Sequence, residues 1–314
     1  MGDAIRIRER DSREVFPIGR NGIADADTSN HVFKPTAESK LWRRVSGLKV
    51  LMYHRITEER ELAERSEFCV HKEEFCKQLE LLMQHGYTPI TFNDYELYNR
   101  GEIQLPQKPV ILTFDDGYLD TFHIAYPLLL EFGMRAVIFV LGNRDHKTNH
   151  WDEHHPDIPV AFLMEESHIT ELHNRDFEIG AHSMNHVNLA MVSEREAYKE
   201  ISMGKERLED LLGTSVNSFS YPYGSVNPVV KSLVAQSGFD FACSVFTGPP
   251  KTGDDRFEIR RMTIHGKMGL SEFLLRLKTP IEYLDWFRWK FSRNENGRRA
   301  GQRDFCTPQS DQKE

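Results

Sequence analysis

Hydrophobic positions in the middle of the chain follow two alternating patterns. Short apolar runs predict strands, and longer segments with apolar residues at helical spacing follow them. The predicted strands cover residues 50–54, 110–114, 135–141, 177–181, 219–221 and 239–245. Because strands and helices alternate along the chain, the pattern favours an α/β protein with a mostly parallel sheet.

The segments between these strands predict helices over residues 72–85, 193–212, 227–237 and 270–277. One face of the first helix carries the apolar residues Phe75, Leu79, Leu82 and Met83. Gly86 and Gly213 follow the first two helices and predict where each one ends. Another helix is expected between residues 118 and 132, with a bend at Pro127.

The two ends of the chain lack this periodicity. Residues 1–45 are rich in charged and small polar residues, which predicts a poorly structured arm. Residues 291–314 are similarly polar and predict a tail. One domain over residues 46–290, without an internal repeat, is therefore expected to hold the functional residues.

Two adjacent carboxylates, Asp115 and Asp116, stand where the strand at 110–114 runs into Gly117. Loops at the carboxyl ends of parallel strands build the active face of many α/β proteins. Neighbouring acids repel each other, so a metal ion that binds one of them would separate their roles. A solvated Asp-Asp-Gly turn is the alternative interpretation.

A second predicted strand end carries two histidines. His182 follows the strand at 177–181, and His186 comes four residues later, a spacing that places both imidazoles on one face of a helical turn. With one aspartate they would form a set of two histidines and a carboxylate, which leaves positions open for water and substrate. Non-haem iron oxygenases use the same set, but that interpretation leaves Asp115 and His54 without a role.

Two further strand ends carry polar groups. His54 follows the apolar run that starts at Val50, and Ser220 to Gly224 reads Ser-Tyr-Pro-Tyr-Gly. Pro222 and Gly224 restrict the backbone there, so that the amide of Tyr223 could face a ligand. Taken alone, each of these would be an ordinary end of a strand.

Together these residues resemble the motifs of the polysaccharide deacetylases, the carbohydrate esterase family with the NodB-type domain. The runs Thr-Phe-Asp-Asp-Gly at 113–117 and His-Ser-Met-Asn-His at 182–186 match its first two motifs. Ser-Tyr-Pro-Tyr-Gly is similar to the third, and Leu51-x-x-His54 resembles the Leu-x-x-His motif. The early position of that last motif resembles the circularly permuted branch, which includes the poly-N-acetylglucosamine deacetylases of biofilm matrix. The resemblance covers about residues 47–280.

The resemblance implies a fold and a metal centre. The expected fold is a distorted, incomplete (β/α)7-type barrel of mostly parallel strands, with the catalytic domain over residues 46–290. Asp116, His182 and His186 would hold one divalent metal ion at the carboxyl mouth of the barrel. This ligand set suits zinc best, although cobalt, nickel and iron accept it as well.

The resemblance also implies roles for the neighbouring residues. Asp115 would be the general base, His54 the general acid, and the amide of Tyr223 would stabilise the oxyanion. The family's third motif commonly begins with an arginine that braces the base, whereas Ser220 stands there in this chain. Arg261 is the predicted replacement, with Arg260 as the second candidate. His265 is an alternative to His54 as the acid.

The implied reaction is metal-dependent removal of N-acetyl groups from N-acetylhexosamine units of a polysaccharide or oligosaccharide. A bound divalent ion lowers the pKa of water from about 15.7 to ~7, and Asp115 would take the remaining proton. A histidine suits the protonation of the leaving amine. The alternatives are hydrolysis of another small amide or imide on the same barrel, or an inactive carbohydrate-binding protein, an option that Ser220 keeps open.

Composition and charge restrict the classes of molecule that the protein is expected to bind. A formal net charge of −8 argues against nucleic acid or an anionic membrane as the main partner, and no apolar run is long enough to span a membrane. The first 22 residues lack the apolar region of a signal peptide, which predicts a cytoplasmic location. The four scattered cysteines are expected to be the free thiols Cys69, Cys76, Cys243 and Cys306.

Aromatic residues and one long loop are candidates for substrate contact. The four tryptophans, whose rings could stack on sugar faces, are Trp42, Trp151, Trp286 and Trp289. The loop at 142–159 has the length of a lid. Besides Trp151, this loop carries His146, His150, His154 and His155. A solvated insertion is the alternative.

Overall fold

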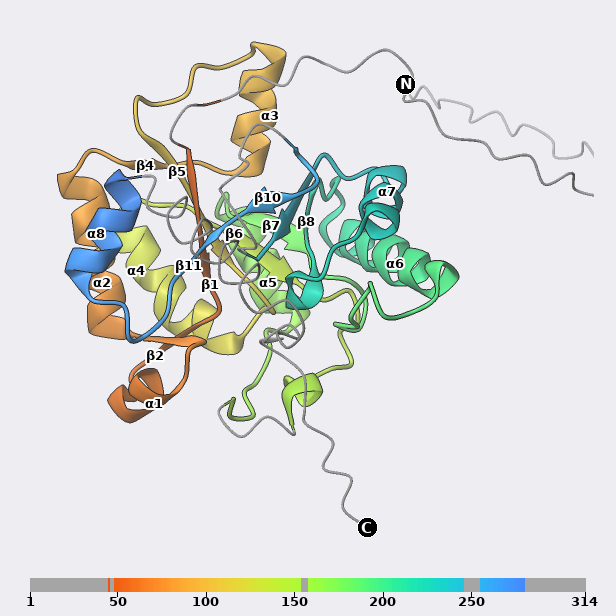
Figure 1. The fold of residues 1–314 in the computed structure, drawn as a ribbon, viewed down its shortest axis with the longest axis horizontal. Helices are drawn as coiled ribbons and strands as arrows, with labels where there is room; N and C mark the ends of the chain where they lie inside the picture. Colours follow the sequence, from red (N-terminus) through yellow and green to blue (C-terminus); the bar gives the residue numbers. More distant parts are fainter. Residues whose placement is uncertain (1–44, 46–47, 154–157, 246–254, 280–314) are drawn as a thin grey trace, which may run out of the picture. The chain divides into compact units, whose positions relative to one another are not determined.

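A parallel sheet forms the core of the protein, as the computed structural model in Figure 1 shows. The structure describes residues 45, 48–153, 158–245 and 255–279, all within the compact unit Leu41–Glu314. The first strands of the sheet are β1 (Lys49–Tyr53), β4 (Thr88–Pro89), β5 (Pro109–Phe114), β6 (Val137–Val140) and β7 (Glu178–Ala181). The remaining ones are β8 (Ser218–Ser220), β9 (Phe241–Ser244), β10 (Ile259–Arg260) and β11 (Met262–Thr263).

One short segment joins the two edges of this sheet. The strand order is β10-β9-β8-β7-β6-β5-β1-β11, with β4 paired to β5 beside this path. β10 pairs with β9, while β11 pairs with β1 at the opposite edge. Because only Arg261 separates β10 from β11, the segment bridges both edges, and the sheet becomes a nearly closed barrel. The predicted distorted barrel of parallel strands is confirmed.

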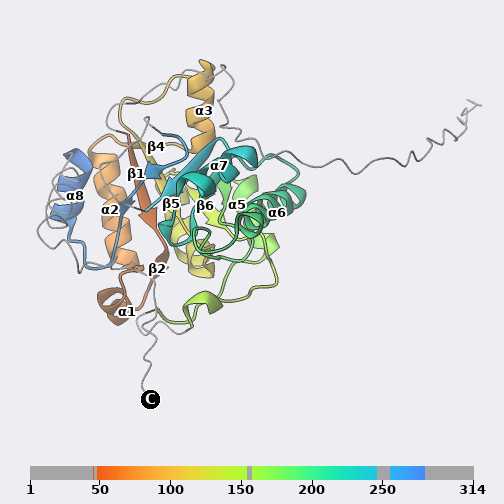
Figure 2. The same cartoon turned by 45° about the vertical axis from the view of Figure 1, so that its right-hand side comes forward.

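Helices lie outside the strands in both views (Figures 1 and 2). They are α1 (Arg60–Arg65), α2 (Lys72–Gln84), α3 (Phe92–Arg100), α4 (Tyr126–Glu131), α5 (Glu166–Asn174), α6 (Glu194–Leu212), α7 (Pro228–Gln236) and α8 (Leu270–Lys278). Local capping explains why several bounds agree with the prediction. Ser193 accepts a hydrogen bond from the amide of Glu196 at the start of α6, and Gly213 ends that helix in the left-handed conformation.

The apolar face predicted for α2 is wrong at one position. Met83 is 55% exposed, whereas Gln78 is fully buried on the face that packs against the sheet. The side-chain oxygen of Gln78 accepts a hydrogen bond of 2.9 Å from the hydroxyl of Tyr53 on β1, which compensates the burial of that oxygen. A polar residue thus occupies the core-facing position because the strand offers it a partner.

The helix expected after Tyr118 divides into two parts. A π-helical turn, η1 (Thr121–Ala125), precedes α4, and the amide of Tyr126 bonds to the carbonyl of Thr121, five residues earlier. Pro127 has no amide hydrogen to continue an α-helical ladder, which accounts for the change at this place. The predicted irregularity therefore takes the form of a π turn.

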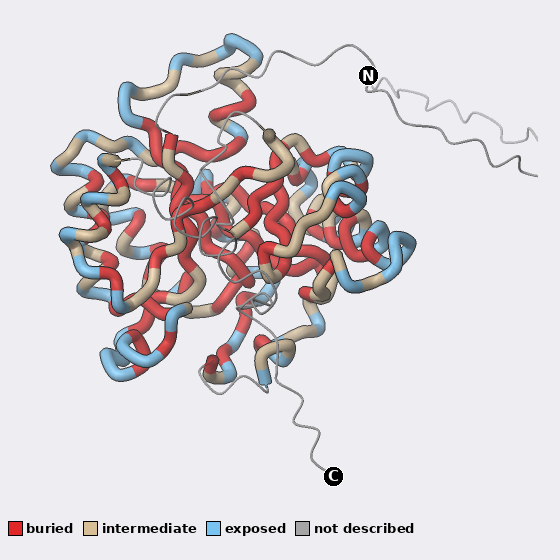
Figure 3. The backbone as a smooth tube through the Cα atoms, in the orientation of Figure 1, coloured by how far each residue is buried: buried red, intermediate tan, exposed pale blue. Residues whose placement is uncertain are grey.

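Strand residues alternate between the barrel interior and the surrounding helices. Ile111 and Phe139 belong to the interior cluster, while Leu112 and Ile138 belong to the outer one. Figure 3 shows the strands as almost continuously buried. Because the period along a strand is two, a residue that follows Ile111 at even spacing also faces the interior. Asp115 is such a residue.

A two-stranded sheet of β2 (Arg55–Thr57) and β3 (Cys69–His71) lies beside the barrel strands. Cys69, Cys76 and Cys243 are free thiols, as predicted, and Cys306 lies outside the described residues. Within the described ranges, no helix combines the length and the apolar character that a membrane span requires. The following predictions also fall outside these ranges: the arm up to residue 44, the tail at 291–314, His154, His155, Trp42, Trp286 and Trp289.

Candidate metal and acid–base site

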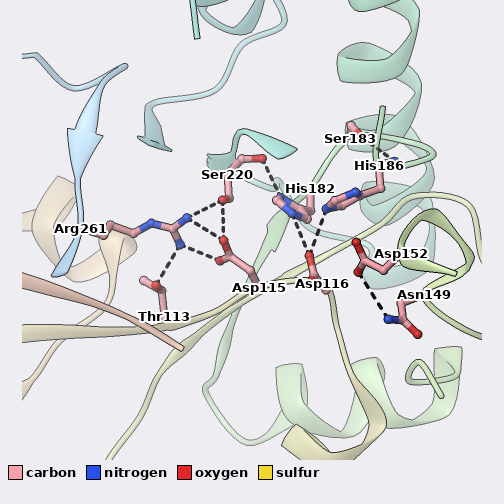
Figure 4. A network of polar contacts seen from close by, with 10 residues as sticks. All are labelled: Thr113, Asp115, Asp116, Asn149, Asp152, His182, Ser183, His186, Ser220 and Arg261. Carbon is pink, nitrogen blue, oxygen red and sulfur yellow. Dashed lines mark hydrogen bonds and ion pairs between the residues drawn. The ribbon is translucent and has the colours of Figure 1, made fainter. Parts of the chain in front are cut away.

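Asp115 lies at the carboxyl end of β5, and Arg261 binds both of its carboxylate oxygens (Figure 4). Nη1 of Arg261 is 2.6 Å from Oδ1, and Nη2 is 2.6 Å from Oδ2. The side chain of Arg261 is fully buried. Its position between β10 and β11 directs it into the barrel, since those strands close the sheet. Arg260 instead pairs with Glu258 at 3.0 Å, so the two candidate arginines have different partners.

Two hydroxyl groups complete this cluster. Nη1 of Arg261 donates to Thr113 Oγ1 at 3.0 Å, and Nη2 donates to Ser220 Oγ at 2.9 Å. The hydroxyl of Ser220 in turn donates to Oδ2 of Asp115 at 3.0 Å. Sequence reasoning did not identify Thr113 as a site residue, although its spacing of two from Asp115 places both on one face of β5.

The environment keeps Asp115 charged. Burial by itself raises the pKa of this carboxyl, but the charge and hydrogen bonds of Arg261 outweigh burial and hold the pKa below its ordinary value. A bidentate arginine also fixes the orientation of a carboxylate. Asp115 is therefore a preoriented anion inside the barrel.

Asp116, His182 and His186 are buried and offer three ligand atoms that all lie within 4.8 Å of one another. Nε2 of His182 is 3.1 Å from Oδ1 of Asp116, and Nε2 of His186 is 3.2 Å from the same oxygen. The structure thus brings together the three residues predicted as metal ligands.

The donor set fits a divalent cation. Nδ1 of His182 lies 2.8 Å from the carbonyl oxygen of Ser220, which can only accept, so Nδ1 carries the hydrogen. In the neutral ring Nε2 then presents a lone pair to a carboxylate oxygen, and a positive charge is needed between them. Burial lowers the pKa of His182, yet the hydrogen bond and charge of Asp116 raise it overall, whereas at His186 burial outweighs Asp116 and lowers the pKa.

Backbone conformation at the site departs from the prediction. His182 and His186 do not lie on a helical turn, because Ser183 and His186 adopt left-handed conformations with φ of 61° and 60°. The amide of His186 donates to Ser183 Oγ at 3.0 Å and closes a different turn. Asp116 and Tyr223 are left-handed as well, with φ of 71° and 59°. Such residues cost about 1–3 kcal/mol each and cluster at functional sites.

His54 lies at the end of β1, where its ring packs edge-on against Phe68 at 5.0 Å. Burial lowers the pKa of His54, and the nearby negative charges of Asp116 and Asp115 act in the opposite direction. His54 is therefore within the electrostatic field of the two aspartates. His265 follows β11, and the amide of its neighbour Ile264 bonds to the carbonyl of Met52 on β1.

Tyr223 belongs to the short helix η3 (Pro222–Gly224) that follows β8. Its ring meets the ring of His186 edge-on, with centroids 4.7 Å apart. Gly224 is required next to it, because a Cβ there would come within 2.4 Å of the Val245 side chain and its φ is +62°. The turn thus holds Tyr223 against one of the candidate metal ligands.

The loop that follows β6 reaches the same place. Trp151, in the short helix η2 (His150–Asp152), stacks on the ring of His186 with centroids 4.4 Å apart. Asp152, which sequence reasoning missed, lies near Asp116 and His186 in Figure 4. Burial, together with the charge of Asp116, raises the pKa of Asp152 to about 7. Because Asp152 lies in a loop, no periodic sequence pattern identified it as a site residue.

Comparison with known proteins agrees with this geometry. A sequence model of the polysaccharide deacetylase family matches residues 102–242. The Bacillus subtilis protein YxkH is 26% identical over 227 residues, which are 72% of this chain and 74% of YxkH. The poly-β-1,6-N-acetyl-D-glucosamine N-deacetylase of Staphylococcus aureus is 24% identical, over 72% of this chain and 80% of its own. The Escherichia coli protein of that name is 23% identical over 76% of this chain but only 39% of its own length.

Solved structures share the barrel. IcaB from Ammonifex degensii superposes with a TM-score of 0.61 and 24% identity, over 74% of this chain and 97% of its own. The Streptococcus pyogenes deacetylase PplD superposes with a TM-score of 0.63 and 21% identity, over 74% and 98%. Fold and side-chain cluster together define a parallel barrel with a candidate metal centre at its mouth. Residues 102–242 belong to a polysaccharide deacetylase domain, and the described barrel has the fold of the solved deacetylases.

Proposed function

We propose that this protein is a metal-dependent hydrolase that removes N-acetyl groups from N-acetylhexosamine units of a polysaccharide or oligosaccharide. The family match and the names of the relatives support the substrate class. The observation that carries the proposal is the pair of neighbouring aspartates with separate partners. Arg261 binds Asp115, while His182 and His186 face Asp116.

Asp116, His182 and His186 would hold one divalent ion, for which zinc suits the donor set best and cobalt, nickel or iron are compatible. When bound, such an ion polarises an amide carbonyl and makes water a stronger nucleophile at neutral pH. The hydrogen bond from His182 to Ser220 would keep the imidazole in the tautomer that such a ligand needs.

Asp115 would accept the proton of the attacking water as general base. Arg261 fixes the direction of its carboxylate, so the base is preoriented before substrate binds. The amide of Tyr223, held by the left-handed turn at η3, would donate to the oxyanion that forms on the substrate. His54 would donate a proton to the departing amine nitrogen, which leaves poorly as an anion.

The direct test is acetate release from N-acetylglucosamine oligomers by metal-stripped protein to which zinc, cobalt or nickel is restored. We expect metal-dependent release that falls roughly 10²–10⁴-fold in Asp115→Asn and in His54→Ala, since each removes one proton-transfer group. Both variants should retain the metal. Near wild-type turnover in either variant would refute the role given to that residue.

The same assay separates the alternatives. Stoichiometric metal without any acetate release would favour hydrolysis of another amide or imide, or an inactive sugar-binding protein. A His265→Ala variant with turnover near that of the wild type would assign the acid to His54, whereas a loss as large as that of His54→Ala would favour His265.

A further inference from the structure

Hydrogen bonds from other segments to its backbone groups hold the turn between the two candidate histidine ligands. Two carbonyls of this turn accept hydrogen bonds from the segment that follows β6. The amide of Gly142 donates to the carbonyl of Ser183 at 2.9 Å, and the amide of Asn143 donates to the carbonyl of Met184 at 3.0 Å. These bonds attach one side of the turn to the segment that follows β6.

Glu200 on α6 holds the other side. Its Oε2 accepts hydrogen bonds from the backbone amides of Met184 at 3.1 Å and Asn185 at 2.8 Å. Its Oε1 accepts a third bond, of 2.6 Å, from the side-chain amide of Asn185. Hydrogen bonds to a carboxylate are shorter and stronger than neutral ones, and Glu200 is only 8% exposed.

Close packing adds to this attachment. Gly204 follows Glu200 by one helical turn, and a Cβ at Gly204 would lie 2.8 Å from the carbonyl carbon of Ser183. Helix α6 can therefore approach the turn closely enough for the carboxylate to reach both amides. In the described part of the chain, all hydrogen-bond partners of Glu200 belong to the turn.

We propose that Glu200 is a positioning residue that orients the two histidines for metal binding, an inference that rests on the proposed metal site. Ser183 and His186 have left-handed backbones, a conformation that persists only when the surroundings impose it. Glu200 supplies the hydrogen-bond acceptors for the peptide units between them. Without its carboxylate the turn relaxes, and Nε2 of His186 leaves its place beside Asp116.

The test compares Co²⁺ binding by the wild type, Glu200→Gln and the control Glu206→Gln. Glu206 is exposed on the same helix, so its variant makes the same change of charge away from the turn. Glutamine has the shape of glutamate, but an NH2 group replaces one of its two oxygens. This group cannot accept a hydrogen bond from the donors of the turn. We expect Co²⁺ affinity to fall roughly 10–100-fold in Glu200→Gln, with an altered visible absorption spectrum at saturation.

Thermal unfolding of the metal-free proteins shows whether Glu200→Gln is folded, and Asn185→Ala provides a second variant. It removes the bond of 2.6 Å to Glu200 and the two contacts of Asn185 Oδ1 with Asn143 at 2.8 Å and His146 at 3.1 Å. Both backbone amide bonds to Glu200 remain, so a smaller, several-fold loss of affinity is expected. Wild-type affinity and spectrum in Glu200→Gln, or in Asn185→Ala should the first variant not fold, would overturn the role of Glu200. A wild-type protein that binds no Co²⁺ would instead overturn the proposed metal site and this inference with it.

Discussion

Two buried carboxyl groups, at opposite ends of barrel strands, show how their partners decide their charge. Asp115 directly follows β5 and pairs with Arg261, which lowers the pKa of the carboxyl group. Glu178 begins β7, and its oxygens accept hydrogen bonds from the Ser218 hydroxyl at 2.6 Å and the Asn93 amide at 2.8 Å. Because these partners are neutral, burial dominates and raises the pKa of Glu178 to about 7.

The comparison separates the carboxylate that we propose as the base from a carboxyl group with a structural role. Burial disfavours the charged form of both carboxyl groups. At Asp115 the charge and hydrogen bonds of Arg261 outweigh burial, whereas Glu178 has no such partner among the residues that the structure describes. The carboxyl end of the barrel therefore keeps an anion available for chemistry. The amino end instead holds a carboxyl group that takes up a proton near neutral pH.

Removing the arginine should have the largest effect. Arg261→Met leaves the buried carboxylate of Asp115 without an opposite charge beside it and with the Ser220 hydroxyl as its remaining hydrogen-bond donor, which costs about 3–5 kcal/mol in the free energy of unfolding. It should also abolish measurable acetate release, because the proposed base loses the two hydrogen bonds that orient it and the positive charge that lowers its pKa. Urea unfolding and the acetate assay would measure the two effects.

Arg261→Lys is the matched control. Lysine restores the charge but not the two parallel hydrogen bonds, so stability should recover more than activity. Full activity in Arg261→Lys would show that only the charge of Arg261 matters. A stable and active Arg261→Met protein would contradict the whole interpretation of the pair.

Glu178→Gln should remove a pH dependence of stability. The folded-state pKa of Glu178 lies above its ordinary value of 4.5, so the folded protein binds this proton more tightly than the unfolded chain. Stability from this group is greatest at low pH, falls as the pH rises from about 4.5 to about 7, and then stays low. Between pH 5.5 and pH 8 the loss amounts to about 2 kcal/mol.

Urea unfolding of the wild type and of Glu178→Gln at these two pH values measures the difference. Asp115 contributes in the opposite sense, because stability from a lowered pKa is present above the unfolded value and is lost as the pH falls through the folded one. An identical pH dependence in both proteins would mean that Glu178 stays charged when buried.

Ser220→Ala should have the smallest effect. It removes one hydrogen bond to Asp115 and one from Arg261 but leaves the bidentate ion pair intact. We expect a loss of about 1 kcal/mol in the free energy of unfolding and a modest decrease in kcat. A loss as large as that of Arg261→Met would show that Ser220, rather than Arg261, holds Asp115 in place.

Local signals predicted much of the fold. The bounds of α6 follow from Ser193 and Gly213, which cap the helix through bonds within the same few residues. The ends of β5 and β7 were predictable because apolar runs stop there and polar residues follow. Prediction was wrong where burial depends on a distant partner. Met83 was expected on the buried face of α2 but is exposed, whereas Gln78, which bonds to Tyr53, is buried there.

The features of the site also divide into those that the sequence predicted and those that depend on distant contacts. Asp116 and His182 were predictable as neighbours because each follows the carboxyl end of a parallel strand, and such ends meet at one mouth. His186 was predicted from its spacing of four from His182 and from the motif that the two histidines share. The left-handed turn at Ser183 and His186 was not predictable, since Glu200 and the segment after β6 help to hold it.

The sequence by itself determined which chemical groups stand at the strand ends, because strand length, side-chain period and helix caps depend on neighbouring residues. Only the tertiary structure decided which of these groups are partners. Arg261 meets Asp115 across 146 residues because the β10–β11 segment closes the barrel between β9 and β1. Closure depends on the whole sheet at once, and no local pattern encodes it.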